Sequence, residues 1–313
     1  MKSSQTFLSL VVPMHNEQEA ISRFFDVVMP ILNHVDDKWE IICINDGSRD
    51  QTLAMLKAIH ASNSKVKIIG LARNFGKENA LTAGLQYACG QVVIPIDADL
   101  QDPPELIPEM VHKWRDGADV VLAIRKDRSF DSFFKKLTAN LFYKFFSKIS
   151  ETEMVPNAGD FRLMDKSVVE ALLTLPERNR FMKGLFAWLG FTQAKVYFSR
   201  PDREAGTTSW SFWKLWNFAL DGITSFSTAP LRIWTYVGGV VSLSAFIFLT
   251  YRVIDTLLNG NPVAGYSSIV ALILFFNGLM MLGMGVFGEY LARIFIEVKQ
   301  RPLYVIKEKI GFD

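Results

Sequence analysis

The stretch Val92-Val93-Ile94-Pro95-Ile96-Asp97-Ala98-Asp99-Leu100-Gln101-Asp102-Pro103-Pro104 decides the fold of this chain. An apolar run with strand character delivers three carboxylates and an amide within six positions. Open α/β sheets bind ligands at the carboxyl ends of their strands. Hard oxygen ligands without His or Cys suit Mg²⁺ or Mn²⁺, which commonly bind through one or two carboxylates plus substrate phosphates. The stretch therefore predicts a diphosphate substrate, with solvated turn residues and N-caps as the alternative interpretation.

Strand-like and helical segments alternate on both sides of this stretch. Strands are predicted at 7–12, 39–44, 66–71, 92–96 and 120–124, and helices at 19–32, 50–61 and 78–89. Strands separated by helices at this spacing indicate an α/β fold with a parallel sheet and nucleotide-binding loops at the strand ends.

The loops after these strands carry polar residues of the types that a sugar nucleotide needs. Asn16 and Glu17 can hydrogen-bond a base or ribose, and Asp46 can accept from a nucleobase N–H. The loop 73–77 is not an ATPase phosphate loop, because position 71 is Leu instead of Gly and Lys77 precedes Glu instead of Ser or Thr.

Composition excludes several classes of protein. The formal net charge of +2 and the lack of a Lys/Arg block argue against nucleic-acid binding. The two cysteines, Cys43 and Cys89, have no metal or disulfide spacing and are expected to be small core residues. No secretory signal peptide is recognised at the start, so the N-terminal part is expected in the cytoplasm.

Two apolar runs near the end, 233–251 and 269–288, are each about the ~20 residues that a helix needs to cross a bilayer. The connection 255–268 has no Lys or Arg. The flanks carry Arg232 before the first run and Arg293, Lys299, Arg301, Lys307 and Lys309 after the second. This asymmetry predicts a two-span hairpin with both ends cytoplasmic; two buried core helices are the alternative.

Two aromatic segments flank the predicted domain end. The Trp-rich segment 211–225 favours a position at the membrane interface. The segment 130–148 mixes Phe and Lys, and it either packs on the domain or lies on a membrane surface.

Several motifs together carry a family resemblance. They are VVPMHNE at 11–17, INDGS at 44–48, RNFGKE at 73–78, DADLQDP at 97–103, GDFRLM at 159–164, REAG at 203–206 and FWKLWN at 212–217. By these motifs the chain resembles the membrane-anchored family 2 glycosyltransferases that charge a polyprenyl phosphate with a sugar, the relatives of dolichyl-phosphate mannose synthase. Within that group it is most similar to bacterial bactoprenol glucosyltransferases.

The resemblance implies a fold and a reaction. It implies a GT-A type domain at 1–209, interfacial helices at 210–231, a transmembrane hairpin at 232–291 and a basic cytoplasmic tail at 292–313. The implied reaction is inverting transfer of glucose from UDP-glucose to undecaprenyl phosphate, with Mg²⁺ or Mn²⁺, at the cytoplasmic face of the bacterial inner membrane. It would serve O-antigen or surface-glycan modification. A homo-oligomer is also implied, since relatives form tetramers. Another sugar nucleotide, carrying mannose or a modified sugar, and a catalytically silent membrane scaffold are the alternatives.

The same resemblance assigns residues. Asp99 and Gln101 match the metal-coordinating pair, with Asp97 beside them. Four residues match positions that line the uridine pocket of the family: Pro13, Asn16, Glu17 and Asp46. Arg203 matches an arginine that closes over the diphosphate, and Asp160 an acidic residue proposed as base or acceptor organiser; with Asp99 they form the implied catalytic set. The implied acceptor-binding residues are Arg73, Asn74, Lys77, Arg125, Arg128, Lys135 and Asp160.

Three features qualify these assignments. Asn45 stands where many relatives have Asp. Ser209 stands where, in many relatives, a Lys follows the Arg-x-x-Gly-x-Thr pattern. For Asp160 a salt bridge to Arg162 or another nearby cation is the structural alternative. A processive polysaccharide synthase is disfavoured because the chain has no Gln-x-x-Arg-Trp segment.

Overall fold

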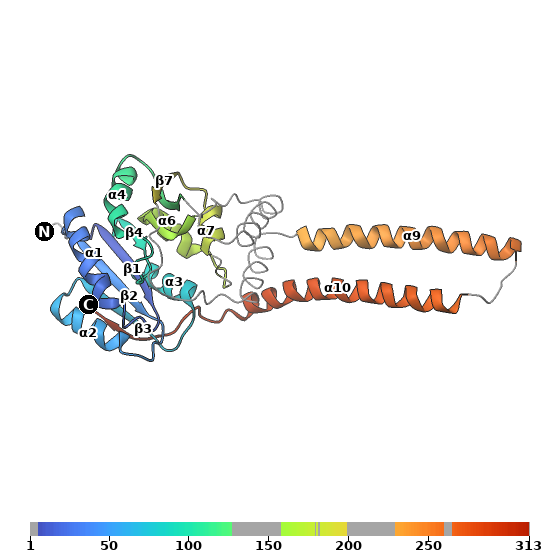
Figure 1. Ribbon diagram of the computed structural model, residues 1–313, viewed down its shortest axis with the longest axis horizontal. Helices are drawn as coiled ribbons and strands as arrows, with labels where there is room; N and C mark the ends of the chain where they lie inside the picture. Colours follow the sequence, from blue (N-terminus) through green and yellow to red (C-terminus); the bar gives the residue numbers. More distant parts are fainter. Residues whose placement is uncertain are drawn as a thin grey trace.

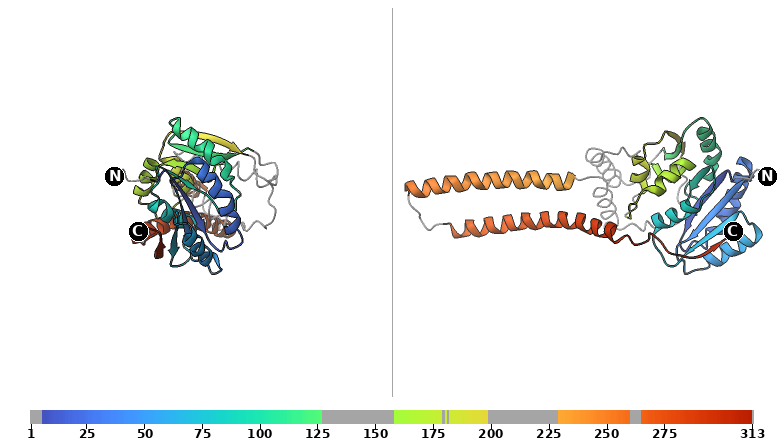
Figure 2. Two further views of the ribbon diagram at one scale, coloured as in Figure 1. Left: turned by 90° about the vertical axis from the view of Figure 1, so that its left-hand side faces the viewer. Right: turned by 180° about the vertical axis from the view of Figure 1, so that it is seen from behind.

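The computed structural model describes residues 6–126, 158–178, 180, 182–198, 229–259 and 265–312. These residues form an α/β domain and two long helices that run side by side away from it (Figure 1). Figure 2 shows the same arrangement from behind.

One sheet forms the centre of the domain. Its strands are β1 (Leu8–Met14), β2 (Trp39–Asn45), β3 (Val66–Leu71), β4 (Val92–Pro95), β5 (Val120–Arg125), β6 (Ala158–Asp165), β7 (Gln193–Phe198) and β8 (Ile306–Ile310). Their order across the sheet is β7-β5-β6-β4-β1-β2-β3-β8. Among these strands four neighbouring pairs are parallel and three are antiparallel. The predicted α/β fold with a mostly parallel sheet is therefore confirmed, and the five predicted strands correspond to β1 to β5.

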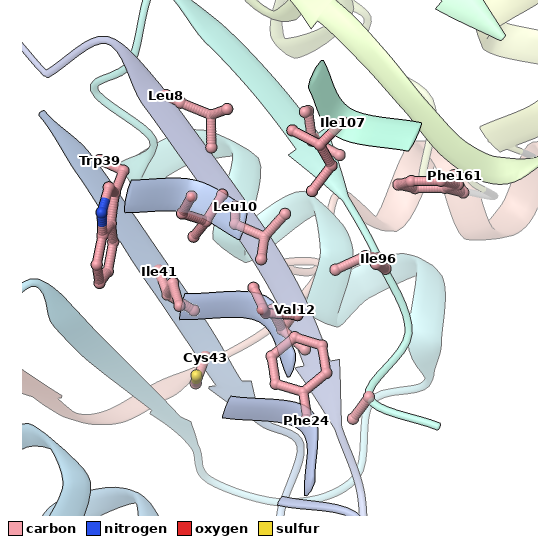
Figure 3. Packing of buried hydrophobic residues seen from close by; sticks show 14 of the residues in the cluster. Leu8, Leu10, Val12, Phe24, Trp39, Ile41, Cys43, Ile96, Ile107 and Phe161 are labelled. Atoms are coloured by element: carbon pink, nitrogen blue, oxygen red, sulfur yellow. The ribbon is translucent and has the colours of Figure 1, made fainter. Parts of the chain in front are cut away.

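Helices cover both faces of the sheet. One face carries α1 (Ile21–Val35), α2 (Thr52–Ser62) and α4 (Ile107–Arg115), and the other carries α3 (Lys77–Tyr87), α6 (Lys166–Thr174) and α7 (Met182–Trp188). Side chains of β1 alternate between the two cores: Leu10 and Val12 pack with Phe24 of α1 (Figure 3), whereas Val11 packs with α3. Burial on both sides explains why the central strands are continuous apolar runs instead of alternating ones.

Strand β6 was not predicted, and it sits in the middle of the sheet. It pairs antiparallel with β4, with Val92 opposite Asp165 and Val93 opposite Met164. Continuing this register to the carboxyl end of β4 brings Asp160 opposite Asp97. The antiparallel insertion thus places a carboxylate that is distant in sequence beside the DADLQ turn.

The two terminal helices are α9 (Ala229–Asn259) and α10 (Tyr266–Lys299). Their described apolar side chains are largely exposed, as at Phe246 and Phe287. Two spans were predicted; among the described residues, Phe275–Lys299 is long and apolar enough to cross a membrane, and Tyr236–Phe248 is a shorter apolar segment. The predicted interfacial segments, at 130–148 and 211–225, lie outside the described residues.

After α10 the chain returns to the domain. Strand β8 pairs antiparallel with β3 at the sheet edge, and the backbone N–H of Ala72 donates to the carbonyl of Val305 at 2.9 Å. The backbone N–H of Arg178 donates to the Glu297 carboxylate near the end of α10, at 2.8 Å. The segment interpreted from sequence as a basic tail therefore contains the last turns of α10 and an edge strand.

Gly84 tests the close packing of α3 on the sheet. A Cβ there would lie 2.3 Å from Val11 Cγ1 and 2.6 Å from Ile44 Cδ1, both in the core. We expect Gly84→Ala to destabilise the protein by about 1 to 3 kcal/mol, because overpacking outweighs the helix propensity of Ala. Thermal denaturation of the purified protein measures this loss.

Gly70→Ala is the matched control. Its Cβ would approach the Glu308 side chain at 2.9 Å, and that side chain is partly exposed and can move. A melting temperature lowered equally by both substitutions would contradict the packing argument.

Candidate functional site

A cavity of about 240 Å³ opens at the carboxyl ends of β1, β2 and β4. Seven predicted site residues line it: Pro13, Glu17, Asp46, Asn74, Lys77, Asp97 and Asp99. Loops from four separate βα connections thus converge, as the sequence analysis predicted for a nucleotide site.

Asp46 is buried and holds two of these loops together. Its Oδ1 accepts the backbone N–H of Phe75 at 2.7 Å, and its Oδ2 accepts that of Gly76 at 2.9 Å. The neighbouring Gly47 has φ +64°, and a Cβ there would lie 2.5 Å from the carbonyl carbon of Arg73. From its position in sequence, Asp46 is predicted to contact the nucleobase; in the structure its carboxylate holds the 73–76 loop.

Asn16 likewise holds two loops together. It adopts a left-handed backbone with φ 57°, its N–H donates to Ser48 Oγ, and its Oδ1 accepts the N–H of Arg49 at 2.9 Å. The loop after β1 is therefore held against the loop after β2. Asn16 does not line the cavity, whereas Glu17 beside it does.

Four carboxylates line the cavity: those of Glu17, Asp46, Asp97 and Asp99. Burial raises the pKa of Glu17, and the negative charges of Asp99, Asp97 and Asp50 raise it further. Burial also raises the pKa of Asp97, and the Lys77 ammonium partly offsets this. Neighbouring negative charges that raise the pKa values of Glu17 and Asp97 mark a site where a cation is stabilising.

Lys77, the first residue of α3, contacts two carboxylates at once. Its Nζ lies 2.7 Å from Asp97 Oδ2 and 2.9 Å from Asp160 Oδ2. Burial alone would lower the pKa of this ammonium, but the charges of Asp160 and Asp97 outweigh it and raise the pKa. Lys77 is thus the nearby cation that the alternative interpretation of Asp160 required.

Arg162 supports Asp160 from the same strand. Its buried guanidinium stacks on Phe186 at 3.9 Å and donates to the carbonyl of Gly159 at 2.5 Å and, at a longer 3.4 Å, to that of Asp160. Burial lowers the pKa of Arg162 to about 10. The backbone that carries Asp160 is therefore held by a side chain locked in the core.

The remaining predicted residues are more dispersed. Arg73 is exposed and lies over the Phe75 ring at 4.2 Å, and Arg125 ends β5 without lining the cavity. Gln101 also stays off the cavity wall; its backbone N–H donates to Asp99 Oδ1 at 3.0 Å. Arg128, Lys135 and Arg203 lie outside the described residues.

The donor chemistry fits a divalent ion held jointly with a ligand. In the part of the chain that the structure describes, no three Asp, Glu, His or Cys side chains form a ready-made metal site. Mg²⁺ and Mn²⁺ do not require one, since they commonly bind one or two carboxylates plus substrate phosphates. Asp97 and Asp99, both on the cavity wall, supply such a pair.

Comparison with known proteins identifies the family. The model of glycosyl transferase family 2 matches residues 9–173, which include every residue that lines the cavity. The chain belongs to this family. It is therefore a glycosyltransferase, and its sheet is that of the predicted GT-A-like fold.

Similar proteins extend over nearly the whole chain. The bactoprenol glucosyl transferase of Shigella phage SfII is 51% identical, covering 96% of this chain and 97% of that protein. A prophage bactoprenol glucosyl transferase homolog of Escherichia coli K12 is also 51% identical, over 96% and 98%. An uncharacterized glycosyltransferase of Synechocystis is 50% identical, over 98% and 96%. The resemblance predicted from the motifs is confirmed.

Asp46→Asn tests the loop contact. The substitution replaces one accepting oxygen with a donor that faces a backbone N–H. We expect a loss of about 1.5 to 3 kcal/mol, as for a hydrogen bond to a charged group, seen as a lower midpoint in chemical denaturation. Asp116→Asn, at an exposed carboxylate paired with His112, is the control and should change little. Equal midpoints for the two variants would refute the role of Asp46.

Proposed function

We propose that this glycosyltransferase transfers glucose from UDP-glucose to undecaprenyl phosphate at the cytoplasmic face of a bacterial inner membrane. Relatives named as bactoprenol glucosyl transferases over nearly their full length support the choice of substrates. The observation that carries the proposal is the contact of Lys77 with both Asp97 and Asp160, because it joins the carboxylate that we assign to the acceptor to the edge of the cavity that we assign to the donor.

The donor would lie in the cavity with its uridine toward Pro13 and Glu17. A divalent ion held by Asp99 and Asp97, with Gln101 from the same turn, would neutralise charge on the departing diphosphate. Arg203 would add a planar, permanently charged fork for phosphate oxygens.

The acceptor needs positioning more than deprotonation. A phosphate monoester has its second pKa near ~6, so it is already largely ionised at neutral pH. Asp160 would therefore organise the acceptor and its counter-charges, with Lys77, Arg125, Arg128 and Lys135 attracting the phosphate. Attack in a single displacement inverts C1 and gives a β-linked product from an α-linked donor.

The terminal helices suit this acceptor. A polyprenyl tail stays in the bilayer, so the catalytic domain must sit at the membrane surface. We place α9 and α10 across the membrane as a hairpin, with the domain and the chain end cytoplasmic, and expect the protein to assemble with copies of itself.

Two carboxylate variants separate the proposed roles. Asp99→Asn should abolish transfer and weaken binding of UDP with Mn²⁺, because it removes a charged ligand with little change in volume. Asp160→Asn should cut transfer to the lipid strongly while binding of UDP with Mn²⁺ survives. Calorimetric titration of the purified full-length variants, together with a transfer assay, measures both. Near-normal turnover of Asp99→Asn, or of the wild type in EDTA, would refute the metal-dependent mechanism.

Membrane topology is tested by cysteine labelling. The background is Cys89→Ser, since Cys43 is buried as expected whereas Cys89, which was expected in the core, is exposed just beyond the end of α3. Cysteines at Asn259, where α9 ends, and at the exposed Lys307 of β8 should react with an impermeant reagent from opposite sides of the membrane. Labelling of both from the same side would rule out the hairpin.

A further inference from the structure

Lys77 stands where local electrostatics disfavours a cation. It is the first residue of α3, after Gly76 with φ +92°, and the N-terminus of a helix carries positive partial charge. Residues that go against a local preference are expected at functional sites, where other interactions compensate for the cost. The compensation here is the pair of carboxylates, Asp97 and Asp160, that flank the ammonium.

The ammonium occupies the same carboxylate that a divalent ion needs. Lys77 Nζ is 2.7 Å from Asp97 Oδ2, and both side chains are partly exposed, at 43% and 38%. An ion that binds Asp97 and Asp99 must either displace this contact or share the carboxylate with it. Either arrangement brings like charges together, at a cost that solvent reduces without removing.

The charge of the incoming species decides the size of that cost. A free divalent ion brings its full positive charge to the ammonium. The same ion on a nucleoside diphosphate is neutralised by the phosphate oxygens, which themselves attract the ammonium. We propose that Lys77 makes the site select a divalent ion that is already bound to a nucleoside diphosphate over the free ion.

The second contact keeps the ammonium in place during this exchange. Asp160, at 20% exposure, lies 2.9 Å from Lys77 Nζ, and its backbone is held by the buried Arg162. When the divalent ion with its nucleoside diphosphate binds Asp97, the ammonium of Lys77 would keep its contact with Asp160, beside the incoming acceptor. Lys77 is thus a positioning residue that orders metal and nucleotide binding. The inference rests on the proposed metal-dependent donor site.

The experiment measures binding of Mn²⁺ to the purified full-length protein by electron paramagnetic resonance, with and without UDP. In the wild type, Mn²⁺ alone should bind weakly and UDP should tighten it strongly. In Lys77→Met, Mn²⁺ alone should bind about tenfold tighter, because a positive charge a few ångströms away is gone. The tightening by UDP should shrink in the same variant, while Lys77→Arg, which keeps the charge, should retain the wild-type pattern.

Two further variants make the result specific. Lys57→Met removes a lysine of similar exposure that pairs with Glu308 at 2.6 Å, away from the cavity, and controls for net charge. Lys77→Gln, a polar neutral replacement, repeats the test if the Met variant denatures at a lower temperature. Unchanged or weaker binding of Mn²⁺ alone in both neutral variants would overturn the inference while leaving the donor site intact. No binding of Mn²⁺ to the wild type even with UDP would instead overturn the proposed donor site, and the inference with it.

Discussion

The antiparallel pairing of β6 with β4 is the constraint on which the site depends. A purely parallel sheet would align the carboxyl ends of successive strands, and each loop would follow its own strand. Inserting β6 in the opposite direction brings the beginning of a strand to that edge instead. Asp160, two residues after β6 begins, is therefore brought close to Asp97, just beyond the end of β4, and Lys77 contacts both carboxylates. A carboxylate that is distant in sequence thus reaches the edge of the cavity through sheet register.

Charge balance follows from this register. Asp97 and Asp160 are brought together at a partly buried edge, where two carboxylates repel each other unless a cation lies between them. Lys77 fills that position from α3, whose own placement depends on the Asp46 contacts with the loop before it. Strand order, loop fastening and the ion pairs are therefore one connected arrangement, because weakening the loop would also move the ammonium.

The parts of the fold that sequence predicted are those with a local signal. Ile41 to Ile44 and Val92 to Ile94 are continuous apolar runs, and each is buried from both sides, so a strand was the natural prediction. Strand β6 has no such signal at its start, where Gly159, Asp160 and Arg162 interrupt the apolar pattern. Strand β8 has Ile at each end and Lys, Glu and Lys between them, charges that are typical of an edge strand, but only its pairing with β3 identifies it. Lys77 was predicted as a site residue, but its contact with Asp160 could not be predicted, because it joins residues 83 positions apart that the register of β6 brings together.

The segment that follows α10 connects the apolar helices to the cavity. Helix α10 ends at Lys299 and β8 begins at Ile306, and a linker of this length spans at most about 20 to 25 Å when extended. The last residue before β8, Val305, accepts the N–H of Ala72, which directly precedes the cavity loop at 73–76. The Glu297 carboxylate near the end of α10 fixes the backbone of Arg178 in the domain as well. The cavity is thus tethered close to the end of α10. If α10 spans the bilayer, this tether holds the cavity close to the membrane surface, as a lipid-linked acceptor that stays in the bilayer requires.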